Sequence, residues 1–89
     1  MDREYVVRIV VPRRDRVRVS GVVERLEKEG FLVRHRVERL FENRPDLDSF
    51  EYVFLIELST LEVRRLRDEL GKKLSGTIGF FQVYPASRY

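Results

Sequence analysis

Four arginines in six residues, Arg13-Arg14-Asp15-Arg16-Val17-Arg18, are the side chains in this sequence best suited to binding chemistry. They stand where a predicted strand leads into a predicted helix. Arginine adds to the positive potential of a helix start, so the segment suits an anion such as a carboxylate, a phosphate or an acidic partner. A solvated loop, with Asp15 as a partial counter-ion, explains the same residues and stays open.

Catalytic chemistry has few candidates, and we expect a protein that is not an enzyme. The one histidine, His35, falls inside a predicted strand between two arginines. Asp46 and Asp48 form a short acidic pair in a predicted loop, which is too few ligands for a metal site. The chain has no cysteine, phosphate-binding glycine loop or nucleophile elbow. We therefore expect no catalytic residues, no metal and no cofactor.

Composition predicts a single folded domain over residues 1–89. A hydrophobic fraction of 43% supports a core, and the charged residues are interspersed with apolar ones. Arginine outnumbers lysine 15 to 3, which fits either a heat-adapted (thermophile) protein or a high-GC genome. The net charge of +3 permits a polyanionic partner without implying one. No apolar run is long enough for a membrane span and no signal peptide is visible, so we expect a cytoplasmic protein.

The first half of the chain reads as strand, helix, strand. Tyr5–Val11 is nearly all apolar, as in a central strand. The helix after it is predicted to begin near Arg16, capped by Asp15, or later, capped by Ser20, and to end before Gly30. Its apolar stripe consists of Val19, Val22, Val23 and Leu26.

The second strand is expected to place Phe31, Val33 and Val37 on one face. A polar loop, Asn43–Ser49, then leads to the third strand, Phe50–Leu58. The even-numbered residues of that third strand should face the helices. This alternation predicts two half-buried neighbouring strands.

The second half repeats the order strand, helix, strand. Ser59 and Glu62 form a capping box that starts the second helix. The fourth strand is expected over Ile78–Tyr84, ending at Pro85. The helix stripe consists of Val63, Leu66, Leu70 and Leu74. The complete order predicts an α+β fold, a ferredoxin-like βαββαβ sandwich whose four-stranded antiparallel sheet carries two helices on one face.

The sheet face turned away from the helices is expected to be unusually apolar. An apolar patch of this kind usually meets another protein surface, so we expect a homodimer through this face. RNA binding through the sheet would need exposed aromatics, and Tyr52 and Phe54 would reach this face only with a register shift of one residue. The expected outward residues are Val6, Arg8, Val10, Val53 and Leu55, with either Phe80 and Tyr84 or Phe81 and Val83.

Two segments, Glu42-Asn43-Arg44-Pro45 and Glu51–Leu58, resemble the ACT regulatory domain at the C-terminus of prephenate dehydratases. That family carries a Glu-Ser-Arg-Pro motif, then a strand close to Glu-Tyr-Val-Phe-Phe-Ile-Asp. Its last strand is followed by a Tyr-Pro pair, as at Tyr84-Pro85. The resemblance implies a regulatory domain that pairs through its sheets and binds phenylalanine at the dimer interface.

The resemblance also implies a ligand site between the loop that opens the first helix and the second strand of the neighbour. Counting back from Gly30 places Arg16-Val17-Arg18-Val19 on the family's Pro-Gly-Ala-Leu loop, whose proline and glycine are not preserved. Arg14, Arg16 and Arg18 would supply charge and helix-start amides. The neighbour would contribute Glu42, Asn43 and Arg44, where the motif letters match, or instead Arg36 and Glu38, where counting forward from Gly30 places the motif.

Three functions follow as hypotheses. The leading one is a stand-alone, non-catalytic regulatory domain that binds a small carboxylate ligand, an amino acid, at a homo-oligomer interface and acts on a partner enzyme. The second is a nucleic-acid-associated protein, with binding that falls steeply with salt. The third is a structural subunit of a larger complex. The nucleic-acid hypothesis would place the phosphate contacts on Arg13, Arg14, Arg16, Arg18, Arg34 and Arg36.

Overall fold

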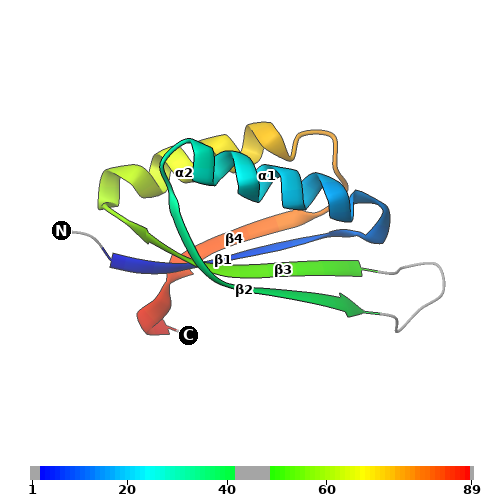
Figure 1. Cartoon of the computed structure of the whole chain (residues 1–89), viewed down its shortest axis with the longest axis horizontal. Coiled ribbons are helices and arrows are strands. Elements are labelled where there is room, and N and C mark those ends of the chain that lie inside the picture. Colours follow the sequence, from blue (N-terminus) through cyan, green and yellow to red (C-terminus); the bar gives the residue numbers. More distant parts are fainter. Residues whose placement is uncertain (1–2, 42–48, 89) are drawn as a thin grey trace.

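The protein is an antiparallel four-stranded sheet with two helices packed on one face. The computed structural model describes residues 3–41 and 49–88. The strand order is β2-β3-β1-β4, and the helices lie on one side of the sheet while the C-terminal turn lies on the other (Figure 1). The predicted ferredoxin-like βαββαβ fold is confirmed. The elements are β1 (Arg3–Pro12), the 3₁₀ turn η1 (Arg13–Asp15), α1 (Arg16–Lys28), β2 (Leu32–Phe41), β3 (Ser49–Leu58), α2 (Thr60–Lys73), β4 (Phe80–Pro85) and the 3₁₀ turn η2 (Ala86–Arg88).

The hydrophobic core fills the space between the helices and the inner face of the sheet. Val7 and Ile9 of β1 and Phe54 and Ile56 of β3 have no exposed surface, as the predicted alternation requires. Both predicted helix stripes face this core, although Leu74 at the end of the second is only partly buried. The fully or largely buried stripe residues are Val19, Val22, Val23, Leu26, Val63, Leu66 and Leu70.

Two helix ends follow the predicted local signals, and the start of α1 does not. Ser59 Oγ accepts a hydrogen bond from the amide of Glu62, whose carboxylate accepts one from the amide of Ser59, so the predicted capping box is present. Gly30, with a φ of 97°, ends α1 in a left-handed conformation as predicted. The start of α1 differs, because η1 runs directly into the helix and Asp15 makes no capping hydrogen bond. Ser20 lies inside α1 and caps nothing.

A β-bulge in β2 changes which residues face outward. Arg34 pairs with Leu55 and Val37 pairs with Val53, so β2 has one more residue than β3 between these two pairs. His35 within the bulge has a φ of 53°, in the left-handed region. Because side chains alternate along a strand, the extra residue turns Val37 onto the outer face, where it is 51% exposed. The prediction that Val37 shares a face with the strand's earlier apolar residues was wrong.

The fourth strand begins at Phe80, two residues later than predicted. Gly79 passes so close to β1 that a Cβ there would lie 2.3 Å from the carbonyl oxygen of Val10, and Ile78 before it is 74% exposed. Regular pairing starts only after this close approach, with Phe80 opposite Val10. Of the two alternatives for this strand, the structure places Phe80 and Tyr84 on the outer face and Phe81 and Val83 on the inner one.

Candidate functional site

The predicted ligand segment at the start of α1 is divided between surface and core. Arg14, Arg16 and Val17 are exposed, Val17 to 83%. Val19 is fully buried, so its side chain belongs to the core. The amide of Arg16 donates a hydrogen bond to the carbonyl of Arg13 within η1. This amide is therefore already hydrogen-bonded. A ligand would contact the segment through its exposed side chains rather than through this helix-start amide.

Arg16 meets Glu38 of β2 at the protein surface. Its Nη2 lies 3.5 Å from Glu38 Oε2, and its guanidinium lies 5.5 Å from the centroid of the Phe50 ring. The side chains of Arg16 and Glu38 remain 57% and 42% exposed. An exposed ion pair of this length contributes only about 0–1 kcal/mol, so a ligand can replace it at little cost. The structure thus brings together, within one chain, one cationic and one anionic residue of the predicted site, which the family resemblance placed on different subunits.

Arg18 has a different role, because it reaches across to the end of α2. Its Nη1 donates to Thr77 Oγ1 at 2.7 Å, and its Nη2 donates to the carbonyl oxygens of Lys73, at 3.0 Å, and Ser75. The last carbonyls of a helix have no partner within the helix, and a cation there also opposes the negative end of the helix dipole. The sequence shows that such carbonyls need donors but not that an arginine of the other helix provides them.

Arg36 is also engaged within the chain. It forms an ion pair with Glu27 of α1 and hydrogen-bonds to Tyr52 of β3. Burial raises the pKa of the Tyr52 hydroxyl, and the guanidinium of Arg36 lowers it in part. Of the two predicted residues on the second strand, Glu38 thus lies beside Arg16, whereas Arg36 lies beside Glu27.

The alternative placement of the neighbour's residues, on Glu42, Asn43 and Arg44, lies outside the described residues. The same holds for the acidic pair Asp46 and Asp48. Both placements of the family motif therefore stay predictions. Within residues 3–41 and 49–88, no group of three or more histidine, aspartate or glutamate side chains is arranged to hold a metal ion.

The outer sheet face carries an apolar hollow of about 320 Å³. We call it the outer hollow; its apolar wall is formed by Val6, Val37, Val53 and Leu55, and His35 and Ala86 lie at its border. Towards the other end of the sheet the face becomes polar, where Arg8 pairs with Glu51 and lies over the ring of Phe80 at 5.4 Å. The bulge at His35 enlarges the apolar area beyond the prediction, because it adds Val37.

The nucleic-acid hypothesis finds no single basic face among the described residues. Arg34 is engaged with Glu57 at 3.2 Å and with Glu4 at 3.5 Å, and Arg18 and Arg36 have the contacts given above. The aromatics that could stack on bases, Tyr52 and Phe54, are buried on the inner face. Three of the arginines named for phosphate contact, Arg18, Arg34 and Arg36, are therefore engaged with different groups of the protein itself.

Comparison with known proteins identifies the fold. No protein-family model matches the chain, and no curated protein matches its sequence with significance. An uncharacterized protein from Thermotoga maritima superposes with a TM-score of 0.67 at 16% identity, over 97% of this chain and 99% of that one. An unknown protein from Galdieria sulphuraria superposes with a TM-score of 0.78 at 13% identity, over 96% of this chain and 50% of that one.

A regulatory protein is also among the structural neighbours. The regulatory subunit of aspartate kinase from Thermus thermophilus superposes with a TM-score of 0.66 at 13% identity, over 93% of this chain and 51% of that one. Identities this low establish a shared architecture alone, which is the ferredoxin-like βαββαβ fold. The finer resemblance to prephenate dehydratase domains stays a prediction. In the described part of the chain, no helix is both long and apolar enough to cross a membrane.

Proposed function

We propose that this protein is a non-catalytic regulatory domain that binds an amino acid at the interface of a homo-oligomer. The proposal rests above all on one observation, the exposed pair of Arg16 and Glu38 at 3.5 Å. An amino acid carries a carboxylate and an ammonium group on one carbon. Arg16 would bind the carboxylate and Glu38 the ammonium group, so that the ligand exchanges a weak internal ion pair for two charge-assisted hydrogen bonds.

The surroundings of this pair support the same ligand class. Phe50 lies below the guanidinium of Arg16 and holds it in place through a cation–π contact. Arg14 adds positive charge on the preceding turn, and Val17 is an apolar side chain exposed to 83% on the first turn of α1. A second copy of the chain would complete the site by covering these exposed residues.

The outer hollow supports the homo-oligomer. Its apolar side chains lie on the face opposite the helices, and exposed apolar patches commonly mark protein–protein contacts. Phe80, half exposed, extends the apolar surface across β4. Association through this face would couple ligand binding to subunit packing, and a partner enzyme would respond to the packing that the ligand favours. The regulatory subunit of aspartate kinase, which shares the fold, is consistent with such a role.

The test is calorimetric titration of the protein with each of the twenty amino acids. We expect one side-chain class to bind, with little dependence on salt, and we expect Arg16→Gln and Glu38→Gln each to weaken binding about tenfold or more. Arg64→Gln is the control, because Arg64 is an exposed arginine in α2 away from this pair. Binding that is unchanged in both site variants, or that responds equally to the control, would contradict the proposal.

A further inference from the structure

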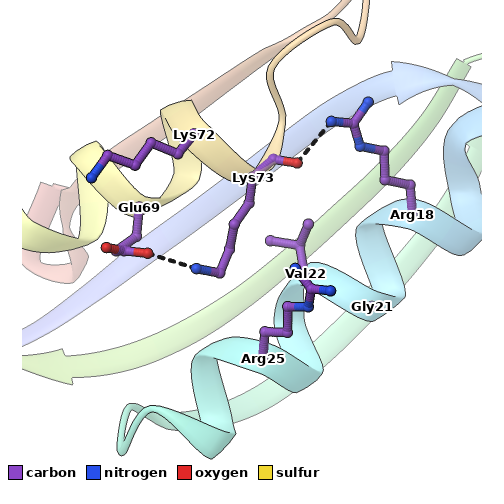
Figure 2. Close-up of a pocket in the computed structure, with 7 residues that line it drawn as sticks. All are labelled: Arg18, Gly21, Val22, Arg25, Glu69, Lys72 and Lys73. Atoms are coloured by element: carbon purple, nitrogen blue, oxygen red, sulfur yellow. Dashed lines mark hydrogen bonds and ion pairs between the residues drawn. The ribbon is translucent and has the colours of Figure 1, made fainter.

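A second concave surface lies between the two helices, on the side of the molecule opposite the outer hollow. It has a volume of about 620 Å³ and runs along the line where α1 and α2 meet (Figure 2). We call it the interhelical groove. The side chains that matter for its chemistry are Arg18, Gly21, Arg25, Glu69, Lys72 and Lys73.

The groove is a strongly basic concave surface. Its wall contains four cationic side chains and one carboxylate, Glu69. Arg25 on α1 and Lys72 on α2 belong to opposite walls, and among the described residues neither side chain makes a hydrogen bond or a short ion pair, although Glu69 attracts Lys72 at longer range. Four cations against one carboxylate give the groove a net positive charge, and a positive concave surface favours a multivalent anion.

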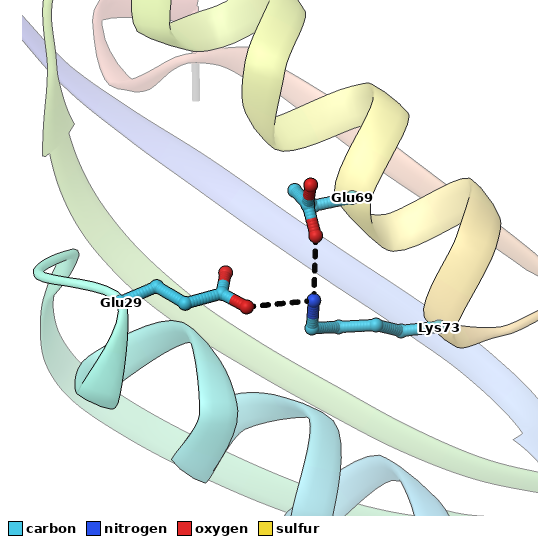
Figure 3. Close-up of polar contacts among 3 residues, drawn as sticks. All are labelled: Glu29, Glu69 and Lys73. Carbon is cyan, nitrogen blue, oxygen red and sulfur yellow. Dashed lines mark hydrogen bonds and ion pairs between the residues drawn. The ribbon is translucent and has the colours of Figure 1, made fainter.

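The other two cations are already positioned by the protein. Lys73 Nζ donates to Glu69 at 2.6 Å and to Glu29 at 2.9 Å, so this ammonium is held between the helices (Figure 3). Arg18 is held by the carbonyl oxygens of Lys73, the last residue of α2, and of Ser75. These contacts keep the two walls at a defined separation, which reduces the ordering cost of a ligand that bridges Arg25 and Lys72.

Gly21 opens the middle of the groove. A Cβ placed there would meet no atom within 4 Å, so the glycine leaves unfilled space above the helix backbone. Glycine inside a helix costs about 0.5–1 kcal/mol relative to alanine, so this open space comes with a loss of stability. Val22, next to it, forms an apolar floor and is 5% exposed.

We propose that the interhelical groove binds an oligophosphate anion, with Arg25 and Lys72 contacting the phosphate oxygens from opposite walls. The volume exceeds what a single phosphate needs, and guanidinium and ammonium groups are the usual partners of phosphate oxygens. The anion is either a free inorganic oligophosphate or the phosphate chain of a nucleotide, which share this chemistry. The site is separate from the Arg16–Glu38 pair, so either proposal can fail without the other.

The test is a thermal-shift titration of the full chain at low salt with inorganic triphosphate, ATP, adenosine and citrate. A ligand that binds only the folded state raises Tm. We expect triphosphate and ATP to raise Tm and adenosine and citrate to leave it unchanged. A larger effect of ATP than of triphosphate would assign the nucleotide as the source, whereas equal effects would assign the phosphate chain alone.

Matched variants tie the binding to the groove. We expect Arg25→Gln and Lys72→Gln each to weaken triphosphate binding about tenfold, and Gly21→Glu, which adds an acid to the open space, to abolish it. Gly21→Ala should keep binding, and Arg64→Gln and Lys28→Gln, which remove the same charge from exposed positions outside the groove, should change it less than twofold. Because glutamate and alanine both favour a helix over glycine, neither Gly21 variant should unfold the protein.

Three results would overturn the proposal. The first is no Tm shift with triphosphate or ATP at low salt. The second is a shift that the groove variants and the exposed controls reduce equally, which would indicate general charge attraction. The third is an equal response to citrate, which would assign the basic surface to another class of anion.

Discussion

Lys73 at the end of α2 donates a hydrogen bond to Glu29, the residue directly after α1, across 2.9 Å (Figure 3). The same ammonium donates to Glu69 one turn earlier in α2, at 2.6 Å. Hydrogen bonds to Glu69 and Glu29 raise the pKa of Lys73, and the side chain is only 11% exposed. A lysine thus links the two helices on the side away from the sheet, in addition to the hydrogen bond that Arg18 of α1 donates to the last carbonyl of α2.

Removing this lysine is expected to destabilise the fold modestly. Lys73→Ala leaves Glu29 and Glu69 facing each other without a cation, and we expect a loss of about 1 kcal/mol because the carboxylates stay partly solvated. For a domain of this size that corresponds to a fall in Tm of about 4–8 °C. Thermal unfolding measures it, with Lys72→Ala, the exposed neighbouring lysine, as the control. Equal Tm values for the two variants would show that the link contributes nothing to stability.

Acid should weaken the start of α2. The backbone amide and then the hydroxyl of Ser59 hold the pKa of Glu62 below its ordinary value. A carboxyl whose pKa is lower in the folded state stabilises the fold above its unfolded pKa, about 4.3, and loses this contribution as pH falls through the folded value. Glu62→Gln keeps a capping-box residue but cannot titrate. Urea unfolding at neutral and acid pH should therefore show a smaller acid loss in Glu62→Gln than in the unmodified protein, and equal losses would contradict the assignment.

Gly79 should not tolerate a side chain. A Cβ at this position would lie 2.3 Å from the carbonyl oxygen of Val10, a backbone atom that cannot move without disturbing β1. We expect Gly79→Ala to cost about 2 kcal/mol or more, measured by urea unfolding. Gly71→Ala is the control, because a Cβ there meets nothing within 4 Å and the helix should gain about 0.5–1 kcal/mol. Similar stability of the two variants would argue against the close crossing of Gly79 and β1.

A charge in the outer hollow should separate subunits without unfolding them. Val37 is half exposed, so Val37→Glu places a carboxylate on the proposed interface and leaves the core intact. We expect the self-association constant from sedimentation equilibrium to fall at least about tenfold, because a charge buried against an apolar partner is unpaired. Leu61→Glu, on a leucine of α2 that is 87% exposed, provides the control. Association that survives Val37→Glu would place the interface elsewhere. If the unmodified protein is already monomeric, the proposed interface does not exist.

Local patterns in the sequence were sufficient for most of the architecture. The alternation around Phe54 predicts its burial, the stripe around Leu66 predicts the inner face of α2, and the pair of Ser59 and Glu62 predicts where that helix begins. Each of these depends on residues only a few positions apart, because the periods of strands and helices and the geometry of a cap are local. The element order that they define leads directly to the ferredoxin-like sandwich.

Contacts between distant segments determined the candidate site. The sequence alone could not show that an extra residue near His35 turns Val37 outward, or that Arg18 serves the end of α2 while Arg16 remains at the surface beside Glu38. An arginine has several possible partners in a chain with 15 carboxylates, and only the packed strands and helices decide which one lies within reach. Local periodicity therefore determined the fold, whereas the chemistry left available at the surface was decided by tertiary structure.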